Sequence, residues 1–158
     1  MDDSIIETPK FICDVHLGKL ARWLRLLGFD TIYRNDLQDK EIIDTAREDQ
    51  RIVLTKDKGV LENGSVKAFQ PDSSLTDGQI QQLLFVFNLN QYIYPFSRCM
   101  ECNGEVYLVE KEHVKNQVPV KILEIINHFY QCQRCGKIYW RGSHYERMKR
   151  WLNKIITL

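Results

Sequence analysis

The first half of the chain alternates short apolar runs with longer stretches in which apolar residues recur at helical spacing. The short runs end at polar residues and are typical of strands. We expect strands at residues 12–13, 31–33, 52–55 and 66–69. We expect helices at residues 17–28, 39–49 and 77–87, the first stopped by Gly28 and the second capped by Asp36 or Asp39. Strands that alternate with helices predict a parallel α/β sheet with right-handed crossovers.

The pattern changes at about residue 96. From there the chain carries short strands, turns and two pairs of cysteines, and it ends in an amphipathic helix predicted from about Tyr145. We therefore divide the chain into an α/β domain at 1–95 and a smaller cysteine-bearing domain at 96–158. The first part has 11 Lys/Arg against 15 Asp/Glu, a net charge of −4, and the second has 11 against 6, a net charge of +5.

The basic second part carries aromatic residues among its charges. From Arg134 to Lys154 seven basic residues are opposed by one acid, Glu146. Basic side chains mixed with stacking aromatics are typical of a nucleic-acid surface, and a solvated basic helix is the simpler alternative. The candidate RNA contacts in this part are Arg134, Tyr139, Trp140, Arg141 and His144. For His144, a structural hydrogen bond is an equal alternative.

Length and composition exclude several classes of protein. With 158 residues, 44% of them hydrophobic, the chain can bury a core and is not disordered. No apolar run approaches the roughly 18 residues of a membrane span, and the acidic N-terminus lacks the apolar segment of a signal peptide. We therefore expect a cytoplasmic protein with no membrane partner. Because that compartment keeps thiols reduced, the five cysteines are not expected to form a disulfide set.

Acidic residues follow the ends of the predicted strands. Asp14 follows the first strand, Asp39 opens the helix after the second, and Asp57 follows the third. The carboxyl ends of parallel strands share one edge with the amino ends of the following helices, so these acids are expected on one rim. Oxygen ligands brought together suit Mg²⁺ or Mn²⁺, which would activate water for phosphodiester hydrolysis. Arg22 and Arg25, on the helix that leaves this rim, are candidate phosphate contacts, with salt bridges or a solvated face as the alternative.

Each acid also has a structural interpretation. Asp39 suits a helix cap, and Asp57 suits a turn or the cap of a short helix. Asp14 is harder to explain in this way, because a carboxylate beside an apolar strand needs a partner. A phosphatase with an aspartyl nucleophile would also place an acid at the end of the first strand. Such an enzyme normally has a second Asp two residues later, where this chain has His16.

Two Cys-x-x-Cys pairs are the strongest signal in the sequence. Cys99 pairs with Cys102, Cys132 pairs with Cys135, and a glycine follows each pair closely. This spacing suits two knuckles that present four thiolates to one tetrahedral Zn²⁺, with a metal-free thiol set as the alternative. Four thiolates leave no open position on the metal, so the zinc is expected to be structural. Cys13 is unpaired and is interpreted as a small buried apolar residue.

These motifs resemble the Mut-seven C-terminal RNase family, a PIN-like nuclease domain followed by a zinc ribbon. The resemblance runs from about Lys10 to Met148 and is carried by DVHLGKLARWLRLLGFD, DKEIIDTAREDQRIVLTKDKGV, SRCMECNG and FYQCQRCGKIYWRGSHYERM. It implies a PIN-like α/β fold, a four-cysteine zinc ribbon and metal-dependent RNase activity. The acids that match the family's motifs are Asp14, Asp39 and Asp57.

The residues and the resemblance together predict endonucleolytic hydrolysis of RNA. The three rim acids would hold Mg²⁺ or Mn²⁺, with Asp36 and Glu41 as candidates for a fourth acid of the kind found in PIN-like sites. The basic second part would bind single-stranded or looped RNA. Two alternatives stay open from sequence: a non-catalytic RNA-binding or ribosome-associated module that keeps the fold, and a phosphatase on the same rim.

Overall fold

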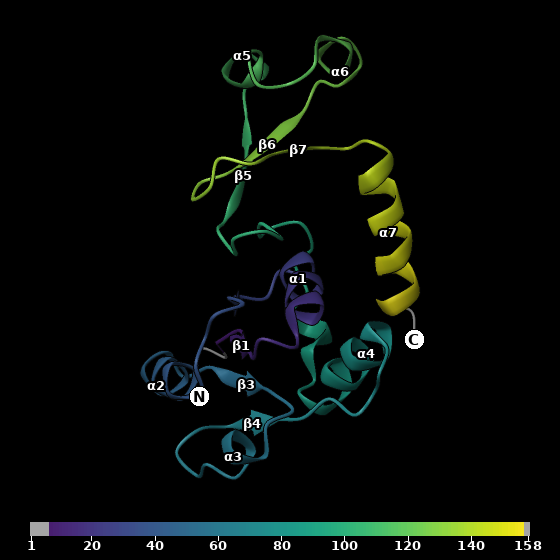
Figure 1. Cartoon of the computed structure of the whole chain (residues 1–158). Coiled ribbons are helices and arrows are strands. Elements are labelled where there is room, and N and C mark those ends of the chain that lie inside the picture. The colour runs from purple at the N-terminus through teal and green to yellow at the C-terminus, as the bar shows by residue number, and fades with distance from the viewer. Residues whose placement is uncertain (1–6, 157–158) are drawn as a thin grey trace, which may run out of the picture.

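The first half of the chain forms a parallel sheet with helices between its strands. A computed structural model describes residues 7–156. The strands are β1 (Phe11–Cys13), β2 (Thr31–Ile32), β3 (Ile52–Leu54) and β4 (Ala68–Phe69). The helices are α1 (Gly18–Leu26), α2 (Asp39–Asp49), α3 (Lys58–Leu61) and α4 (Thr76–Val86), with a 3-10 helix, η1 (Leu89–Tyr92), after them. The strand order is β2-β1-β3-β4 and all neighbours are parallel, which confirms the predicted α/β class (Figure 1).

Alternating side chains bury the parallel sheet on both faces. Phe11 and Cys13 of β1 belong to one core cluster, and Ile12 between them belongs to a second. β3 alternates in the same way and places Val53 in the second cluster. The first cluster contains residues of α1 and α4, and the second contains residues of α2 and α3. The continuous apolar strands in the sequence are therefore explained by helices on both faces of the sheet.

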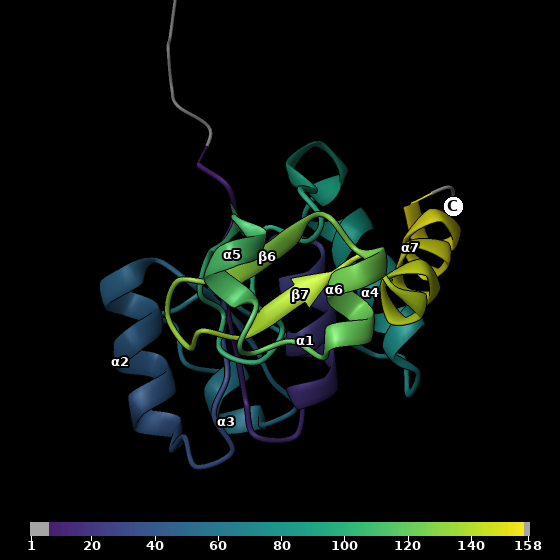
Figure 2. The ribbon, with the colours of Figure 1, turned by 90° about the horizontal axis from the view of Figure 1, so that it is seen from above.

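The second sheet is antiparallel, and we call residues 97–142 the ribbon. Its strands are β5 (Val106–Val109), β6 (Phe129–Cys132) and β7 (Ile138–Trp140), in that order. Two short helices, α5 (Lys111–Val114) and α6 (Val120–Ile125), lie between β5 and β6 and were not predicted. They cover a small apolar core around Val114, Val118 and Phe129. Figures 1 and 2 show the ribbon stacked on the end of the first sheet.

The C-terminal helix, α7 (Ser143–Ile156), leaves the ribbon and packs against the helices of the first sheet (Figure 1). Its buried residues, among them Leu152 and Ile155, belong to the same core cluster as α1 and α4. The rings of Trp23 and Trp151 lie 4.1 Å apart, and the Trp151 indole donates a hydrogen bond to Asp77. The helix therefore holds the ribbon and the parallel sheet together from the side.

The predicted cap of α2 was wrong. The residue before the helix is Gln38, whose backbone N–H donates to a carboxylate oxygen of Glu41 at 3.0 Å. Asp39 is the first residue inside the helix rather than its cap, and Asp36 lies in the preceding turn. The acid-rich stretch before the helix offers several candidate caps, and the sequence does not show which of them reaches the free N–H groups.

Within residues 7–156, no helix is both long enough and apolar enough to cross a membrane.

The buried end of α1 fixes the ribbon to the amino edge of the parallel sheet. Arg25 is 4% exposed, and its guanidinium donates to three backbone carbonyls. One belongs to Thr31, at the start of β2, at 2.9 Å. The other two belong to Met100 and Glu101, in the first cysteine knuckle (residues 99–104), each at 3.0 Å. Arg25 thus connects three segments that are distant in sequence.

Asn103 of the first knuckle adds a second connection at the same edge. Its amide oxygen accepts a hydrogen bond from the backbone N–H of Thr31 at 2.9 Å, and its amide nitrogen donates to Asp30 at 2.7 Å. Asp30 is also held by both terminal nitrogens of Arg51, at 2.7 and 3.2 Å. Burial alone would raise the pKa of Asp30, but the hydrogen bonds from Arg51 and Asn103 lower it below its ordinary value of 3.8.

Asp30→Asn should reveal this lowered pKa as a pH-dependent loss of stability. At pH 7 the variant should unfold about 2 kcal/mol more easily, because charged hydrogen bonds to Arg51 and Asn103 are lost. The carboxyl pKa is lower in the folded than in the unfolded protein, so the ionised Asp30 stabilises the fold above about pH 4. As the pH falls through the folded pKa this contribution is lost, and the two proteins should converge.

Urea unfolding measures the difference in unfolding free energy between the parent and Asp30→Asn. The measurement is repeated in about five steps between pH 3 and pH 7, in buffers of equal ionic strength. Asp49→Asn is the matched control, because Asp49 also pairs with Arg51 but is 48% exposed. A difference that stays constant over this range, or that is absent at neutral pH, would contradict the network.

Candidate active site and metal centre

Asp14 lies buried at the carboxyl end of β1 and accepts three hydrogen bonds. One carboxylate oxygen accepts the backbone N–H of His16 at 2.8 Å. The other accepts the Thr55 hydroxyl at 2.7 Å and the backbone N–H of Lys56 at 2.9 Å. These donors compensate the burial of the carboxylate and fix its orientation. The sequence showed no partner for Asp14, and the structure shows that its main partner is the loop that follows β3.

Asp57 is connected to Asp14 through the same threonine. The Thr55 hydroxyl accepts the backbone N–H of Asp57 at 3.0 Å while it donates to Asp14. One carboxylate oxygen of Asp57 accepts the backbone N–H of Val60 at 3.0 Å, so this residue caps α3. Its side chain is otherwise exposed. The structural interpretation of Asp57 as a helix cap is confirmed, and it leaves the second carboxylate oxygen available.

Asp39 stands exposed at the first residue of α2. We call the carboxyl edge that carries Asp14, Asp39 and Asp57 the rim. Within residues 7–156, the four paired cysteines are the one group of three or more His, Cys, Asp or Glu residues placed closely enough to hold a metal ion, with ligand atoms within 4.8 Å of one another. The rim acids occupy the strand and helix ends that the topology predicts, but their carboxylates do not form such a group.

The two candidates for a fourth acid are bound to an arginine. Asp36 pairs with Arg34 at 2.9 Å, and Glu41 pairs with the same guanidinium at 3.5 Å. Glu41 also holds the backbone N–H of Gln38. All of these side chains are substantially exposed. Asp36 and Glu41 therefore have structural partners, and nothing in their contacts selects one of them as a metal ligand.

The four paired cysteines converge between the two knuckles of the ribbon. The Sγ atoms of Cys99 and Cys135 lie 3.7 Å apart, and those of Cys102 and Cys132 lie 3.4 Å apart. Four sulfurs around one zinc, each about 2.3 Å from it, would be roughly 3.8 Å from one another. The spacing and the chemistry of the donor set fit a tetrahedral metal ion such as zinc.

Cys13 lies apart from this group and is fully buried. Burial raises the pKa of its thiol, so Cys13 is an unreactive core residue.

The backbone around the cysteines is shaped for close approach of the sulfurs. A Cβ atom at Gly104 would lie 2.8 Å from the sulfur of Cys132 and 3.3 Å from that of Cys102, so no larger residue fits there. Burial alone would raise the pKa of Cys132, but backbone N–H groups of Cys135 and Arg134 lower it to about 7. These contacts favour the thiolate of Cys132, the form in which cysteine binds a metal, whereas burial raises the pKa of Cys102 to about 12 and also raises that of Cys135.

The candidate RNA contacts on α1 do not face the rim. Arg25 is buried in the docking contacts at the amino edge, and its donors are engaged with backbone carbonyls. We therefore remove it from the candidate RNA surface. Arg22 is half exposed and pairs with Glu101 of the first knuckle at 3.0 Å. Arg22, in the middle of α1, and Arg25, in its last turn, thus both contact the first knuckle rather than the rim.

The candidate RNA contacts of the ribbon fall into two groups. Tyr139 and Trp140 are half-buried: the Tyr139 hydroxyl lies 2.9 Å from the sulfur of Cys99, and the Trp140 ring packs edge-on against Phe129. The remaining three are exposed at the surface. They are Arg134, Arg141 and His144. Burial and the contact with Cys99 raise the pKa of Tyr139, so its hydroxyl stays protonated beside the sulfur.

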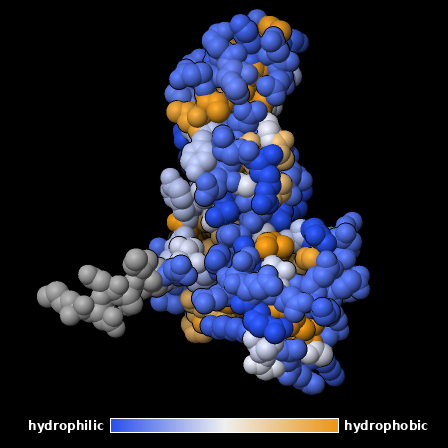
Figure 3. Space-filling model, turned by 90° about the vertical axis from the view of Figure 1, so that its left-hand side faces the viewer, coloured by the Kyte–Doolittle hydropathy of each residue, from blue (hydrophilic) through white to orange (hydrophobic). Residues whose placement is uncertain are grey.

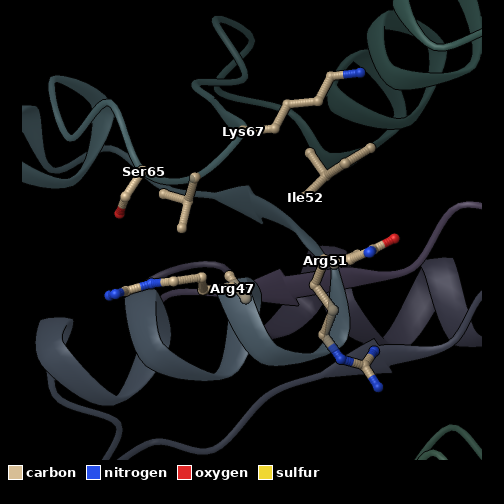
Figure 4. A pocket seen from close by; sticks show the side chains of 8 residues that line it. Arg47, Arg51, Ile52, Ser65 and Lys67 are labelled. Carbon is tan, nitrogen blue, oxygen red and sulfur yellow. The ribbon is translucent and has the colours of Figure 1, made fainter.

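A small pocket at the amino ends of β3 and β4 has a volume of about 230 Å³ and a basic lining. Figure 4 shows that the side chains of Arg47, Arg51 and Lys67 point away from one another. Arg51 is held by Asp30, and Arg47 pairs with Asp44 on its own helix. The basic groups are thus occupied elsewhere, and we assign this pocket no ligand.

Comparison with known proteins identifies the family. A model of the Mut7-C RNAse domain family matches residues 9–152. The chain belongs to this family. Over 116 residues, 69% of the chain, it is 30% identical to a human protein named "Exonuclease mut-7 homolog", of which it covers only 13%. No solved structure matches this Mut7-C chain.

The match to the Mut7-C RNAse domain confirms the resemblance seen in the sequence. The matched residues include all three rim acids and all four paired cysteines. Together with the name of the human relative, the family supports a nuclease-type function. The chain spans about an eighth of that relative, so the activity of the whole relative does not pass to this Mut7-C chain by similarity alone.

Metal removal tests the cysteine cluster. Purified Mut7-C chain should contain about one zinc per chain, and chelation or Cys132→Ser should lower the melting temperature by several degrees, because metal binding here is part of folding. Cys13→Ala is the matched control, since it removes a buried thiol outside the cluster and should keep the metal. Absence of bound metal from protein purified without chelators would overturn the assignment.

Proposed function

We propose that this chain is a Mg²⁺- or Mn²⁺-dependent ribonuclease that cuts RNA internally at the rim. The observation that carries the proposal is the Thr55–Lys56–Asp57 loop, which fixes Asp14 by two hydrogen bonds and places Asp57 beside it. Such an arrangement puts carboxylates from different strands at the edge where open α/β sheets bind ligands. Asp39 and Asp57 are exposed, so an internal phosphodiester of a long RNA has access to them.

The rim residues fit a divalent ion that arrives with its substrate. Mg²⁺ keeps several waters and is usually held by one or two carboxylates together with substrate phosphates, so close gathering of all three acids is not required. Asp14 accepts three hydrogen bonds, and a carboxylate has about four acceptor sites, so one remains for an ion or its water. Asp57 offers its second oxygen, and Asp39 offers its whole carboxylate.

The chain's own groups would divide the work at the rim. A divalent ion, when bound, would supply a more acidic water and would stabilise the charge that develops on the phosphate. Asp14 would hold a fixed position, because the Thr55 hydroxyl and the Lys56 N–H restrain its carboxylate. Asp57 and Asp39, each at the first turn of a helix, would orient water and phosphate from the exposed side.

The rest of the chain would bind RNA and hold the fold. We propose that residues 1–95 form the PIN-like nuclease domain and residues 96–158 the zinc ribbon with its basic helix. Zinc on the four cysteines would be structural, because four thiolates leave it no open position. None of the five cysteines within residues 7–156 forms a disulfide, which suits the proposal of a cytoplasmic protein, since that compartment keeps thiols reduced. Arg134, Arg141 and His144 would contact RNA from the ribbon side.

One observation favours a second candidate, a non-catalytic RNA-binding module. Asp14 accepts three hydrogen bonds from the protein itself, as a purely structural acid would. In that case the rim would keep the fold of a nuclease without its chemistry. The two candidates differ in one outcome, which is metal-dependent cleavage.

Replacement of the exposed rim acids tests the nuclease proposal. Asp39→Asn and Asp57→Asn should each lower Mn²⁺-dependent cleavage of a mixed RNA pool by at least roughly 10- to 100-fold, the range seen even for outer partners of metal sites. Both should keep the parent's melting temperature, because Asn also caps helices and Asp39 is exposed. Asp14→Asn is a poorer test, since its amide would face the donors of Thr55 and Lys56 and should destabilise the fold.

Asp49→Asn, at the opposite end of α2, is the matched control and should cleave like the parent. Mapping of the cut ends separates internal cleavage from trimming at one end. Metal-independent binding without cleavage would favour the non-catalytic module, and release of inorganic phosphate would point to a phosphatase. Normal cleavage by both rim variants would remove the rim from the active site.

A further inference from the structure

A large groove lies where the ribbon meets the amino edge of the parallel sheet. Its volume is about 1380 Å³, and it is bounded by β5, β6 and β7, the segment 92–98 and the first turns of α7. The end of α1 and the residues before β1 and β2 complete it. The rim acids are not among its lining residues, because they stand at the other edge of the sheet. The groove is therefore separate from the proposed active site.

The size of the groove suits a polymer. Pockets that hold one small molecule usually measure about 300–1,000 Å³, and this groove exceeds that range. Its lining extends from the strands of the ribbon to the first turns of α7. On the face shown in Figure 3, apolar surface gathers on the upper lobe, which the ribbon forms, next to hydrophilic surface. An extended ligand with flat apolar and charged parts would match this surface.

Aromatic rings are the main apolar feature that the groove offers. Tyr94 lines it and is 74% exposed. Tyr107 is also among the lining residues, but it pairs with Gln131 and so lies on the opposite face of the sheet from Tyr130. Leu108, Tyr130 and Tyr139 are directly paired across β5, β6 and β7, so their side chains share one face of the sheet. Exposed rings on an antiparallel sheet are a platform on which unpaired bases stack.

The charges in the groove favour a polyanion. Three of its acids already have partners: Asp30 is held by Arg51, Glu101 by Arg22 and Lys137, and Glu105 by the hydroxyl of Tyr107. The basic residues Lys10, Arg98 and Arg141 also line it, and none of them forms an ion pair with an acid within residues 7–156. The Arg141 guanidinium lies 5.6 Å from the Tyr145 ring centre, which sets a cation at the level of an aromatic face.

We propose that this groove binds single-stranded RNA, with bases stacked on Tyr94 and Tyr130 and phosphates beside Arg98 and Arg141. The proposal rests on the proposed function for its substrate, but it assigns binding to a place distinct from the rim. α1 connects the two places, and its nine residues span about 14 Å. A strand held in the groove must therefore extend by about four nucleotides, at the 3.4 Å spacing of a stacked strand, before it reaches the acids.

Binding in EDTA tests the groove independently of cleavage. A fluorescein-labelled single-stranded RNA of about 12 nucleotides, within the range of known single-strand sites, is titrated with full-length protein and followed by anisotropy. Tyr94→Ala and Tyr130→Ala should each weaken binding roughly 5- to 100-fold, the cost of losing one stacked base. Arg141→Gln should weaken RNA binding. It should also reduce the slope of log affinity against log salt concentration by about one, because one phosphate contact is lost. The same sequence as a duplex should bind poorly, since its bases are paired.

Phe85→Ala is the matched control, because Phe85 is 87% exposed on α4 and lies outside the groove. It should bind like the parent. Parent-like affinity in both tyrosine variants would overturn the proposal and would indicate another occupant, such as an apolar peptide. Duplex binding equal to single-strand binding would also overturn it. If the tyrosine variants bind RNA more weakly and the parent shows no cleavage, the RNA-binding groove is supported and the ribonuclease proposal is wrong.

Discussion

The structure depends on the docking of the first cysteine knuckle against the amino edge of the parallel sheet. Asn103 accepts a hydrogen bond from the backbone N–H of Thr31 and donates one to the carboxylate of Asp30. Arg25 donates hydrogen bonds to two carbonyls of the knuckle and to the carbonyl of Thr31 in β2. These are buried polar groups, and each would be costly to leave without a partner. The knuckle can satisfy them only while its backbone is held in place by the cysteines. The cysteine cluster and the α/β core are therefore parts of one folded unit.

This docking also determines where each activity can lie. The ribbon occupies the amino edge and leaves the carboxyl edge uncovered, where Asp39 and Asp57 are exposed and Asp14 lies buried beneath the surface. α7 closes the arrangement from the side through the stacked rings of Trp23 and Trp151. We infer a division of labour in which the groove beside the ribbon holds RNA and the rim acts on a part of the strand further along. The length of α1 sets the separation between the two.

The sequence predicted those features that local patterns determine. The apolar runs of β1 and β3, the helical spacing of α1 and the two Cys-x-x-Cys pairs led to the right class, elements and cysteine cluster. It did not predict that Arg25 is buried, because helical periodicity shows which side of a helix is apolar but not what covers its end. Asn103 and Thr55 were missed for the same reason. Asn103 lies in a cysteine knuckle, but its partner Thr31 is 72 residues away in the sequence. Thr55 lies just before Asp57, but its partner Asp14 is 41 residues away.

The most direct test of this account is hydrogen exchange at the start of β2 with and without metal. The amide of Thr31 is held by Asn103 rather than by a strand neighbour, so it reports on the knuckle. We expect chelation of the metal to speed exchange in residues 29–33 strongly, while residues 68–70 at β4, on the far side of the sheet, stay protected. If exchange increases only within residues 97–142 and residues 29–33 keep their protection, the cysteine cluster and the parallel sheet are independent, and the central claim is wrong.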